Sequence, residues 1–395
     1  MKKKFILFLI YFLFAISVNI VHPITVDYVT SLNLEDHYFG LFVALMSLGQ
    51  VVGALLFGFL SDKFGRKKII IIGLVGYCFA QYGFGFLNKD PIILLLFRFL
   101  AGVFIAAPST LFVSMCLDYS NENNKAKNLT FYSSFYILGT SLGYEIGGAL
   151  YDYLKLSIKQ VFVFQIIFTL MTATIFLFLI KDLYLANKEK EIISNENGQN
   201  IKVKPIVIAL LIPLFILTTA QIIINKYLDT YFIHIGYQAS LLGHYVLFSG
   251  IFSALSNIAI IPLLKKIKNN KLAFCLLVFV FVSSLLTIIT FTAKNNFIYF
   301  LFTTHLLYLI IKGWITPLEQ NEISLYTTQN NKGKITGFRQ MALSLGNVVG
   351  PLIGSAIYIK KSPLVFIIAS IIILIALVLY IIYFLIKNKM ASKEN

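Results

Sequence analysis

Long apolar segments alternate with short polar loops along almost the whole chain. Twelve of these segments are close to or above the length of about 20 residues that a helix needs to cross a bilayer. They lie near residues 4–26, 38–60, 69–87, 92–117, 129–150, 160–182, 204–227, 241–263, 272–291, 296–323, 336–358 and 364–386. This pattern predicts an all-α polytopic membrane protein with 12 transmembrane helices.

The longest polar break divides these spans six and six. It runs over residues 183–203, which are too polar to span and too few to fold alone, so they predict a cytoplasmic linker. The predicted organisation is an N-terminal six-helix half at 1–182, a C-terminal six-helix half at 204–386 and a cytoplasmic tail at 387–395. We expect the apolar run after Met1 to be retained as the first span, because it is long for a signal peptide and lacks a cleavage site.

An internal repeat supports the two halves. Residues 139–151 of the fifth span align without a gap with residues 346–358 of the eleventh span, as expected for a duplicated transporter. Small residues recur within both copies, a pattern that lets helices approach closely. They are Gly139, Gly143, Gly147 and Gly148 in the first copy, and Gly346, Gly350, Pro351 and Gly354 in the second. Generic helix packing and a role in transport are both open for them.

Composition and charge agree with a membrane protein. The chain is 58% hydrophobic and 13% charged, about half the charged fraction of a soluble domain. Its net charge of +16 would indicate nucleic acid in a soluble protein, but here the basic residues gather in alternate loops, with Arg339 among them. By the positive-inside rule we expect both termini in the cytoplasm and no nucleic-acid partner.

Several classes of chemistry are not expected. Cys78, Cys116 and Cys275 are scattered within apolar segments, which argues against disulfides or a zinc site. No phosphate-binding loop of the G-x-x-x-x-G-K-[ST] kind occurs, so ATP-driven transport by this chain alone is not expected. We predict no enzyme activity, no cofactor and no metal.

The loop after the second span carries the most specific motif, Gly58-Phe-Leu-Ser-Asp62-Lys-Phe-Gly65-Arg66-Lys67-Lys68. It resembles the signature of the major facilitator superfamily, G-x-x-x-D-[RK]-x-G-[RK]-[RK], which joins helices 2 and 3 on the cytoplasmic side. The resemblance implies the major facilitator fold and alternating access between two halves. It also implies a gating role for Gly58, Asp62, Gly65, Arg66 and Lys67, with Asp118 as a further member. An ordinary basic loop is the alternative.

The fifth span resembles the antiporter motif of the same superfamily, G-x-x-x-G-P-x-x-G-G, with Tyr144 at the proline position. Together with the size of the chain, this likeness implies the twelve-helix drug:proton antiporter group. The fourth span contains Arg98-Phe-Leu-Ala-Gly102, which is similar to the R-x-x-x-G signature linked to proton coupling.

Ionisable residues within spans are costly and are candidates for function. Arg98 and Glu145 lie at similar depths of two antiparallel neighbours, so we expect them to pair and to couple transport to protons. A purely structural ion pair is the alternative. If Glu145 does not carry the proton, then Asp27, Asp229 or Glu319 is the next candidate.

Polar residues three or four apart also form stripes along the first, seventh and tenth spans. Such stripes must face protein or a water-filled cavity. We expect a substrate cavity lined by Asn19, His22, Gln221, Asn225, His305, Tyr308, Lys312 and Glu319. Hydrogen bonding between helices is the alternative for each stripe.

These features predict a secondary active transporter of the plasma membrane. The first hypothesis is proton-coupled efflux of small amphipathic or drug-like molecules, by a monomer whose partners are the substrate, protons and the lipid bilayer. A transporter of a specific metabolite, such as a sugar or an organic acid, is the second hypothesis. A non-transporting membrane sensor on the same fold is the third.

Overall fold

The computed structural model describes the chain except residues 1, 36, 88–89, 121–124, 182–204, 267–268, 294–295, 327–331 and 395. The described residues form helices joined by short turns, with no strand among them. The predicted linker at 183–203 lies outside the described residues.

Ten helices in the described part of the chain are long and apolar enough to cross a membrane. The shorter apolar α1 and the 28-residue α6 occupy the positions of the predicted first and fifth spans. The pattern of twelve spans predicted from the sequence is therefore confirmed.

The chain divides into two compact units. The first unit comprises Met1–Glu196 and Phe232–Ala254, and the second comprises Asn197–Tyr231 and Leu255–Asn395. The helices α1 (Lys2–Asn19), α2 (Thr25–Ser31), α3 (His37–Phe64), α4 (Arg66–Tyr82), α5 (Pro91–Asp118), α6 (Lys125–Asp152) and α7 (Ile158–Leu179) belong to the first unit. A short π-helix, η1 (Gly83–Leu87), extends α4.

The later helices begin with α9 (Pro205–His234) and α10 (Ala239–Lys266), each of which contributes residues to both units. The second unit also holds α11 (Asn269–Thr292), α12 (Phe297–Phe300), η4 (Leu301–His305), α13 (Leu306–Ser324), α14 (Lys332–Ile357) and α15 (Leu364–Glu394). Because α15 continues through Glu394, residues 387–394 of the expected tail are helical. Lys387, at the start of this segment, lies 2.7 Å from Glu322 of α13.

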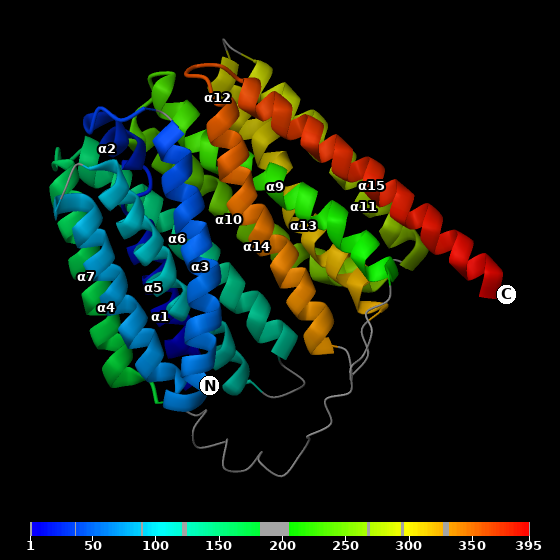
Figure 1. Ribbon diagram of the computed structural model, residues 1–395, viewed down its shortest axis with the longest axis horizontal. Coiled ribbons are helices and arrows are strands. Elements are labelled where there is room, and N and C mark those ends of the chain that lie inside the picture. Colours follow the sequence, from blue (N-terminus) through cyan, green and yellow to red (C-terminus); the bar gives the residue numbers. More distant parts are fainter. Residues whose placement is uncertain are drawn as a thin grey trace. The chain divides into compact units, whose positions relative to one another are not determined.

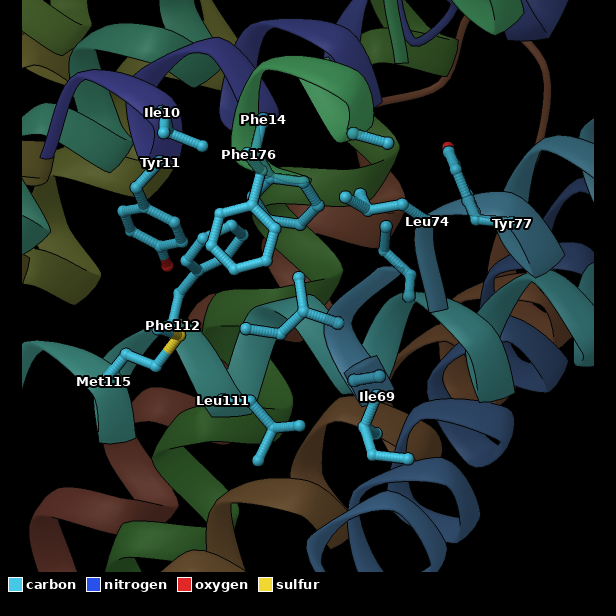
Figure 2. Packing of buried hydrophobic residues seen from close by; sticks show 14 of the residues in the cluster. Ile10, Tyr11, Phe14, Ile69, Leu74, Tyr77, Leu111, Phe112, Met115 and Phe176 are labelled. Carbon is cyan, nitrogen blue, oxygen red and sulfur yellow. The ribbon is translucent and has the colours of Figure 1, made fainter. Parts of the chain in front are cut away.

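The core of the first unit mixes aliphatic and aromatic side chains and forms between α1, α3, α4, α5, α6 and α7. Figure 2 shows Tyr11 and Phe14 of α1 meeting Phe112 of α5 and Phe176 of α7. Tyr11 also stacks on Tyr132 of α6 at 3.7 Å between ring centroids. Lipid is as apolar as these side chains, so close packing rather than escape from water holds the helices together. In Figure 1, α4, α5 and α7 run side by side around this core.

Two helix starts in the first unit follow local rules. The Asp90 carboxylate accepts a hydrogen bond from the Ile92 N–H at 2.8 Å, and Pro91 occupies the first helical position of α5. Ser157 and Gln160 form a reciprocal capping box at the start of α7. These caps begin both helices sharply after short loops.

Candidate functional site

The turn between α3 and α4 is built around Gly65. This residue has φ +91°, in the region that favours glycine, and its N–H donates to the Ser61 carbonyl at 2.9 Å. One residue therefore separates the end of α3 from the start of α4. The tight turn places Arg66 in the first turn of α4.

Arg66 and Asp118 form an ion pair at this turn. The Arg66 Nη1 lies 2.6 Å from the Asp118 Oδ2, and both side chains are largely buried. Arg66 begins α4 and Asp118 ends α5, so each charge lies at the unfavourable end of its own helix dipole. The pair therefore offsets two electrostatic costs and ties the α3–α4 turn to the end of α5. Asp62, on the last turn of α3, is exposed.

Arg98 is buried in the middle of the first unit. Its guanidinium carbon lies 3.8 Å from the centre of the Phe84 ring, and its Nη1 lies 4.0 Å from the Met46 sulfur. The Arg98 Nε has no hydrogen-bond partner among the described residues. The cation is thus stabilised by an aromatic face, in an environment poor in polar partners.

The expected pairing of Arg98 with Glu145 is wrong in this structure. Glu145 Oε2 instead lies 2.8 Å from Nδ1 of His244 on α10, and His244 Nε2 lies 2.9 Å from the Tyr153 hydroxyl. Both ring nitrogens of this histidine are engaged. The physical reason is that a partly exposed imidazole supplies a donor close to Glu145, whereas Arg98 is buried against Phe84.

A second contact joins α6 to α10 within the first unit. The Asp152 Oδ2 accepts the Ser240 N–H at 2.6 Å, which caps the start of α10. A Cβ added at Gly148 would lie 2.6 Å from the Ala239 carbonyl oxygen, and one added at Gly243 would lie 2.9 Å from that of Tyr144. The two helices approach so closely that both backbones need glycine at the contact.

The other repeat glycines of α6 face α1. A Cβ at Gly139 would lie 2.6 Å from the Phe12 carbonyl oxygen, one at Gly143 would lie 2.6 Å from that of Ile16, and one at Gly147 would overlap that of Ile20. In this way three small residues, spaced four apart, let α6 lie directly on the α1 backbone.

The second copy of the repeat packs in the same way within the second unit. A Cβ at Gly346 or Gly350 would meet Thr218 or Thr219 of α9 at 2.9 or 2.8 Å, and one at Gly354 would overlap the Tyr227 ring. The Tyr227 hydroxyl donates to the carbonyl of Pro351 at 3.1 Å. The repeat therefore gives the pairs α6–α1 and α14–α9 the same kind of contact.

A cavity of about 230 Å³ opens between α9, α13 and α14 of the second unit. Its charged lining residues are Lys312, Glu319 and Arg339. Its remaining walls are formed by Leu217, Thr218, Gln221, Ile222, Ile315, Thr316, Leu343 and Asn347. The cavity thus combines an aliphatic wall with a few polar groups, the usual character of a small-molecule site.

Three of the eight residues expected at a substrate cavity line this one, namely Gln221, Lys312 and Glu319. His305 and Tyr308 are buried and stack on each other with ring centroids 5.2 Å apart. The remaining three are Asn19, His22 and Asn225.

Asn19 and His22 lie at the contact of the first span with α6. The Asn19 amide donates to the Ala15 carbonyl at 2.8 Å and to the Thr140 hydroxyl at 3.3 Å. His22 stacks on Tyr144 with a centroid distance of 5.5 Å. The alternative of bonding between helices therefore describes these two side chains, while Asn225 of α9 is partly exposed outside the lining of the cavity.

The acids of α13 meet tyrosines of α15. The Tyr380 hydroxyl donates a short hydrogen bond to Glu319, and the Tyr383 hydroxyl donates to Glu322 at 3.2 Å. Lys387 completes the second group through its ion pair with Glu322. The two acids lie about one helical turn apart on α13, and the two tyrosines lie about one turn apart on α15. The two hydrogen bonds therefore join the helices at successive turns.

Sequence reasoning missed two participants. Arg339 was counted with the loop cations, yet it lines the cavity together with Leu343 and Asn347. The spacing of four between these residues is the signal that would have placed them on one face of α14. His244 was overlooked because its partner, Glu145, lies 99 residues away in the sequence.

Comparisons with known proteins agree with this architecture. A sequence profile of the Major Facilitator Superfamily matches residues 7–311 and residues 281–395. The quinolone resistance protein NorA of Staphylococcus aureus is 31% identical to this chain over 147 residues. That segment is 37% of this chain and 38% of NorA, well under two thirds of either.

Solved transporter structures match over nearly the whole chain. A bacterial homologue of the human lysosomal transporter Spinster has a TM-score of 0.76 at 14% identity and covers 96% of both chains. A D-xylose–proton symporter has a TM-score of 0.72 at 15% identity and covers 95% of this chain and 96% of its own. At these identities the likeness shows the fold alone. From the profile match, the chain belongs to the major facilitator superfamily, and its apolar helices are those of a multi-pass membrane protein.

Proposed function

We propose that this chain exports small amphipathic or drug-like molecules across the plasma membrane in exchange for protons, by alternating access. The observation that carries the proposal is the cavity of the second unit, where Leu217, Ile222 and Leu343 lie beside polar and charged groups. Such a lining suits a partly apolar molecule. The similarity of a 147-residue segment to a quinolone resistance protein supports export as the direction.

Glu145 is the carboxylate that we propose for proton coupling. It joins α6 to α10 through His244, in a contact that depends on charge. A proton on Glu145 removes that charge and weakens the bond, so the α6–α10 contact responds to protonation. Arg98 is the second proposed member, because a buried cation favours the ionised form of any acid that approaches it.

The α3–α4 turn is the proposed gate. Gly65 sets the turn, and the ion pair of Arg66 with Asp118 holds it against α5. We propose that Asp62 and Lys67 act on this gate during transport, with Gly58 giving space for a close approach. Among the described residues, a Cβ at Gly58 would have open space around it.

The wider organisation is proposed on the same basis. The distribution of lysine and arginine supports cytoplasmic termini and a division into halves at 1–182 and 204–386. We propose a monomer as the transporting form. Each half then contributes one copy of the glycine-rich repeat to the transport cycle.

Transport of a fluorescent amphipathic dye into inside-out vesicles tests the proposal. With an acidified lumen, we expect wild-type vesicles to accumulate dye and to lose it when the proton gradient is collapsed. Glu145→Gln should abolish gradient-driven uptake but keep dye exchange at equilibrium. Glu35→Gln is the matched control, because Glu35 is a highly exposed carboxylate. Uptake that survives collapse of the gradient, or unchanged accumulation by Glu145→Gln, would contradict the proposed coupling.

A further inference from the structure

The charges that line the cavity of the second unit do not balance. Lys312 and Arg339 contribute two positive charges and Glu319 contributes one negative charge, which leaves one excess cation. All three lie on helices that cross the membrane region, where an uncompensated charge is costly. An excess cation in this setting requires a partner.

Among the residues that the structure describes, neither cation has a carboxylate at contact distance. The ion pairs of the described residues, defined by an N···O distance of at most 4.0 Å, leave out both Lys312 and Arg339. The Arg339 Nε is buried, and no protein group among the described residues accepts its hydrogen bond. An arginine with an unsatisfied donor at a cavity wall offers a binding group for an anion.

The acids of α13 are already engaged. Glu319 accepts the hydrogen bond of Tyr380, and Glu322 is bound by Tyr383 and by Lys387. Glu322 is also absent from the cavity lining. Glu319 keeps its charge in the hydrogen bond with Tyr380 and acts on Arg339 from beyond contact distance, so it offsets one of the two cavity cations and leaves the other.

We infer that the substrate carries an anionic group, of the carboxylate type, which binds between Lys312 and Arg339 while its apolar part lies on the aliphatic wall. Thr218, Gln221 and Asn347 supply neutral hydrogen-bonding groups beside this position. This inference rests on the proposed function and names its substrate class: amphipathic anions or zwitterions in preference to neutral or purely cationic compounds.

The single tryptophan of the chain makes this binding measurable. Trp314 lies two residues after Lys312 on α13 and packs against Phe279 with ring centroids 5.6 Å apart. A dansyl group bound in the cavity would accept energy from this indole and quench its emission. Dansylglycine, which carries a carboxylate, and dansylglycinamide, its neutral amide, form a matched pair of probes.

The test titrates each probe into the purified full-length protein in detergent, without any gradient. We expect dansylglycine to bind about tenfold or more tightly than the amide, the usual value of one charge-assisted hydrogen bond. Lys312→Gln and Arg339→Gln should each remove most of this preference while keeping amide binding, which also shows that the variants are folded. Lys360→Gln, which removes an exposed cation outside the cavity, should keep the preference.

Equal affinities for the two probes in the wild-type protein would overturn the inference. The inference would also be overturned if Lys312→Gln and Arg339→Gln, while melting like wild type, weakened the binding of both probes to the same extent. Because the measurement needs no transport, its outcome is separate from that of the vesicle assay. A protein that prefers the anion but shows no gradient-driven export would refute the proposed efflux and leave the inference standing.

Discussion

Asp27 provides a pH-dependent test of the first unit. It lies on the short helix α2 after the first span, where partial burial, and next the charge of Asp152, raise its pKa from 3.8 to about 6. Tyr151 is a further titratable group whose surroundings include Asp27. The Asp152 carboxylate is itself held by the Ser240 N–H, so it cannot move away from Asp27 without uncapping α10.

The direction of the effect follows from the raised pKa. Between pH 4 and pH 6 the folded protein binds a proton at Asp27 that the unfolded chain releases, so stability falls as the pH rises through this window. The full change would be about 3 kcal/mol at 1.36 kcal/mol per pKa unit. Solvent screening at a partly exposed carboxylate reduces this to about 1–2 kcal/mol.

Asp27→Asn removes the ionisable group and keeps its shape. We expect the variant to melt a few degrees higher than wild type at pH 7, where wild-type Asp27 is charged, and at nearly the same temperature at pH 4. Thermal unfolding of the purified protein across this pH range measures both values. Glu35→Gln serves as the control, because Glu35 is exposed and its replacement should leave the pH dependence intact. A difference between Asp27→Asn and wild type that is constant from pH 4 to pH 7 would refute the reasoning.

Two further predictions concern the α3–α4 turn and the repeat. Asp118→Arg should lose transport and lower the melting temperature, because it places two cations together. Adding Arg66→Asp should restore part of the transport and part of the melting temperature. No recovery in the double variant would contradict a role for the ion pair. Gly147→Ala should lower the free energy of unfolding by about 1–3 kcal/mol, because its Cβ would overlap the Ile20 carbonyl. Gly58→Ala should melt like wild type. Equal melting temperatures of the two variants would exclude this packing argument.

Much of the fold could be predicted because its causes are local. A span requires a long apolar run. A one-residue turn with a positive φ requires glycine, and Gly65 meets that need between α3 and α4. The glycine faces were also predictable, since spacing by four places small residues on one side of a helix. The ion pair of Lys387 with Glu322 was not predicted, because the two residues lie 65 positions apart in the sequence.

The site was less predictable for the same reason. The depth of Arg98 and Glu145 along their spans indicated that they are neighbours. Which side chains meet is decided by the rotation of each helix about its own axis, which depth does not give. In the structure Arg98 faces Phe84 of η1, while Glu145 faces His244 of α10. Neither contact follows from hydropathy, because each joins segments that no local pattern relates. Arg339 was misplaced because a cation near the end of a span resembles a loop residue in sequence.

The repeat separates what both halves share from what only one half has. The residues of α6 and α14 that match, such as Gly147 and Gly354, pack their helices on α1 and α9 and therefore serve the scaffold. Where the copies differ, α6 carries Tyr144, Glu145 and Gly148, which meet His22, His244 and the Ala239 backbone. The corresponding residues of α14, Pro351, Leu352 and Ser355, include no ionisable group. Two of these three residues, Glu145 and Gly148, meet α10, which is why we propose proton coupling at that contact and substrate binding in the charged cavity of the second unit.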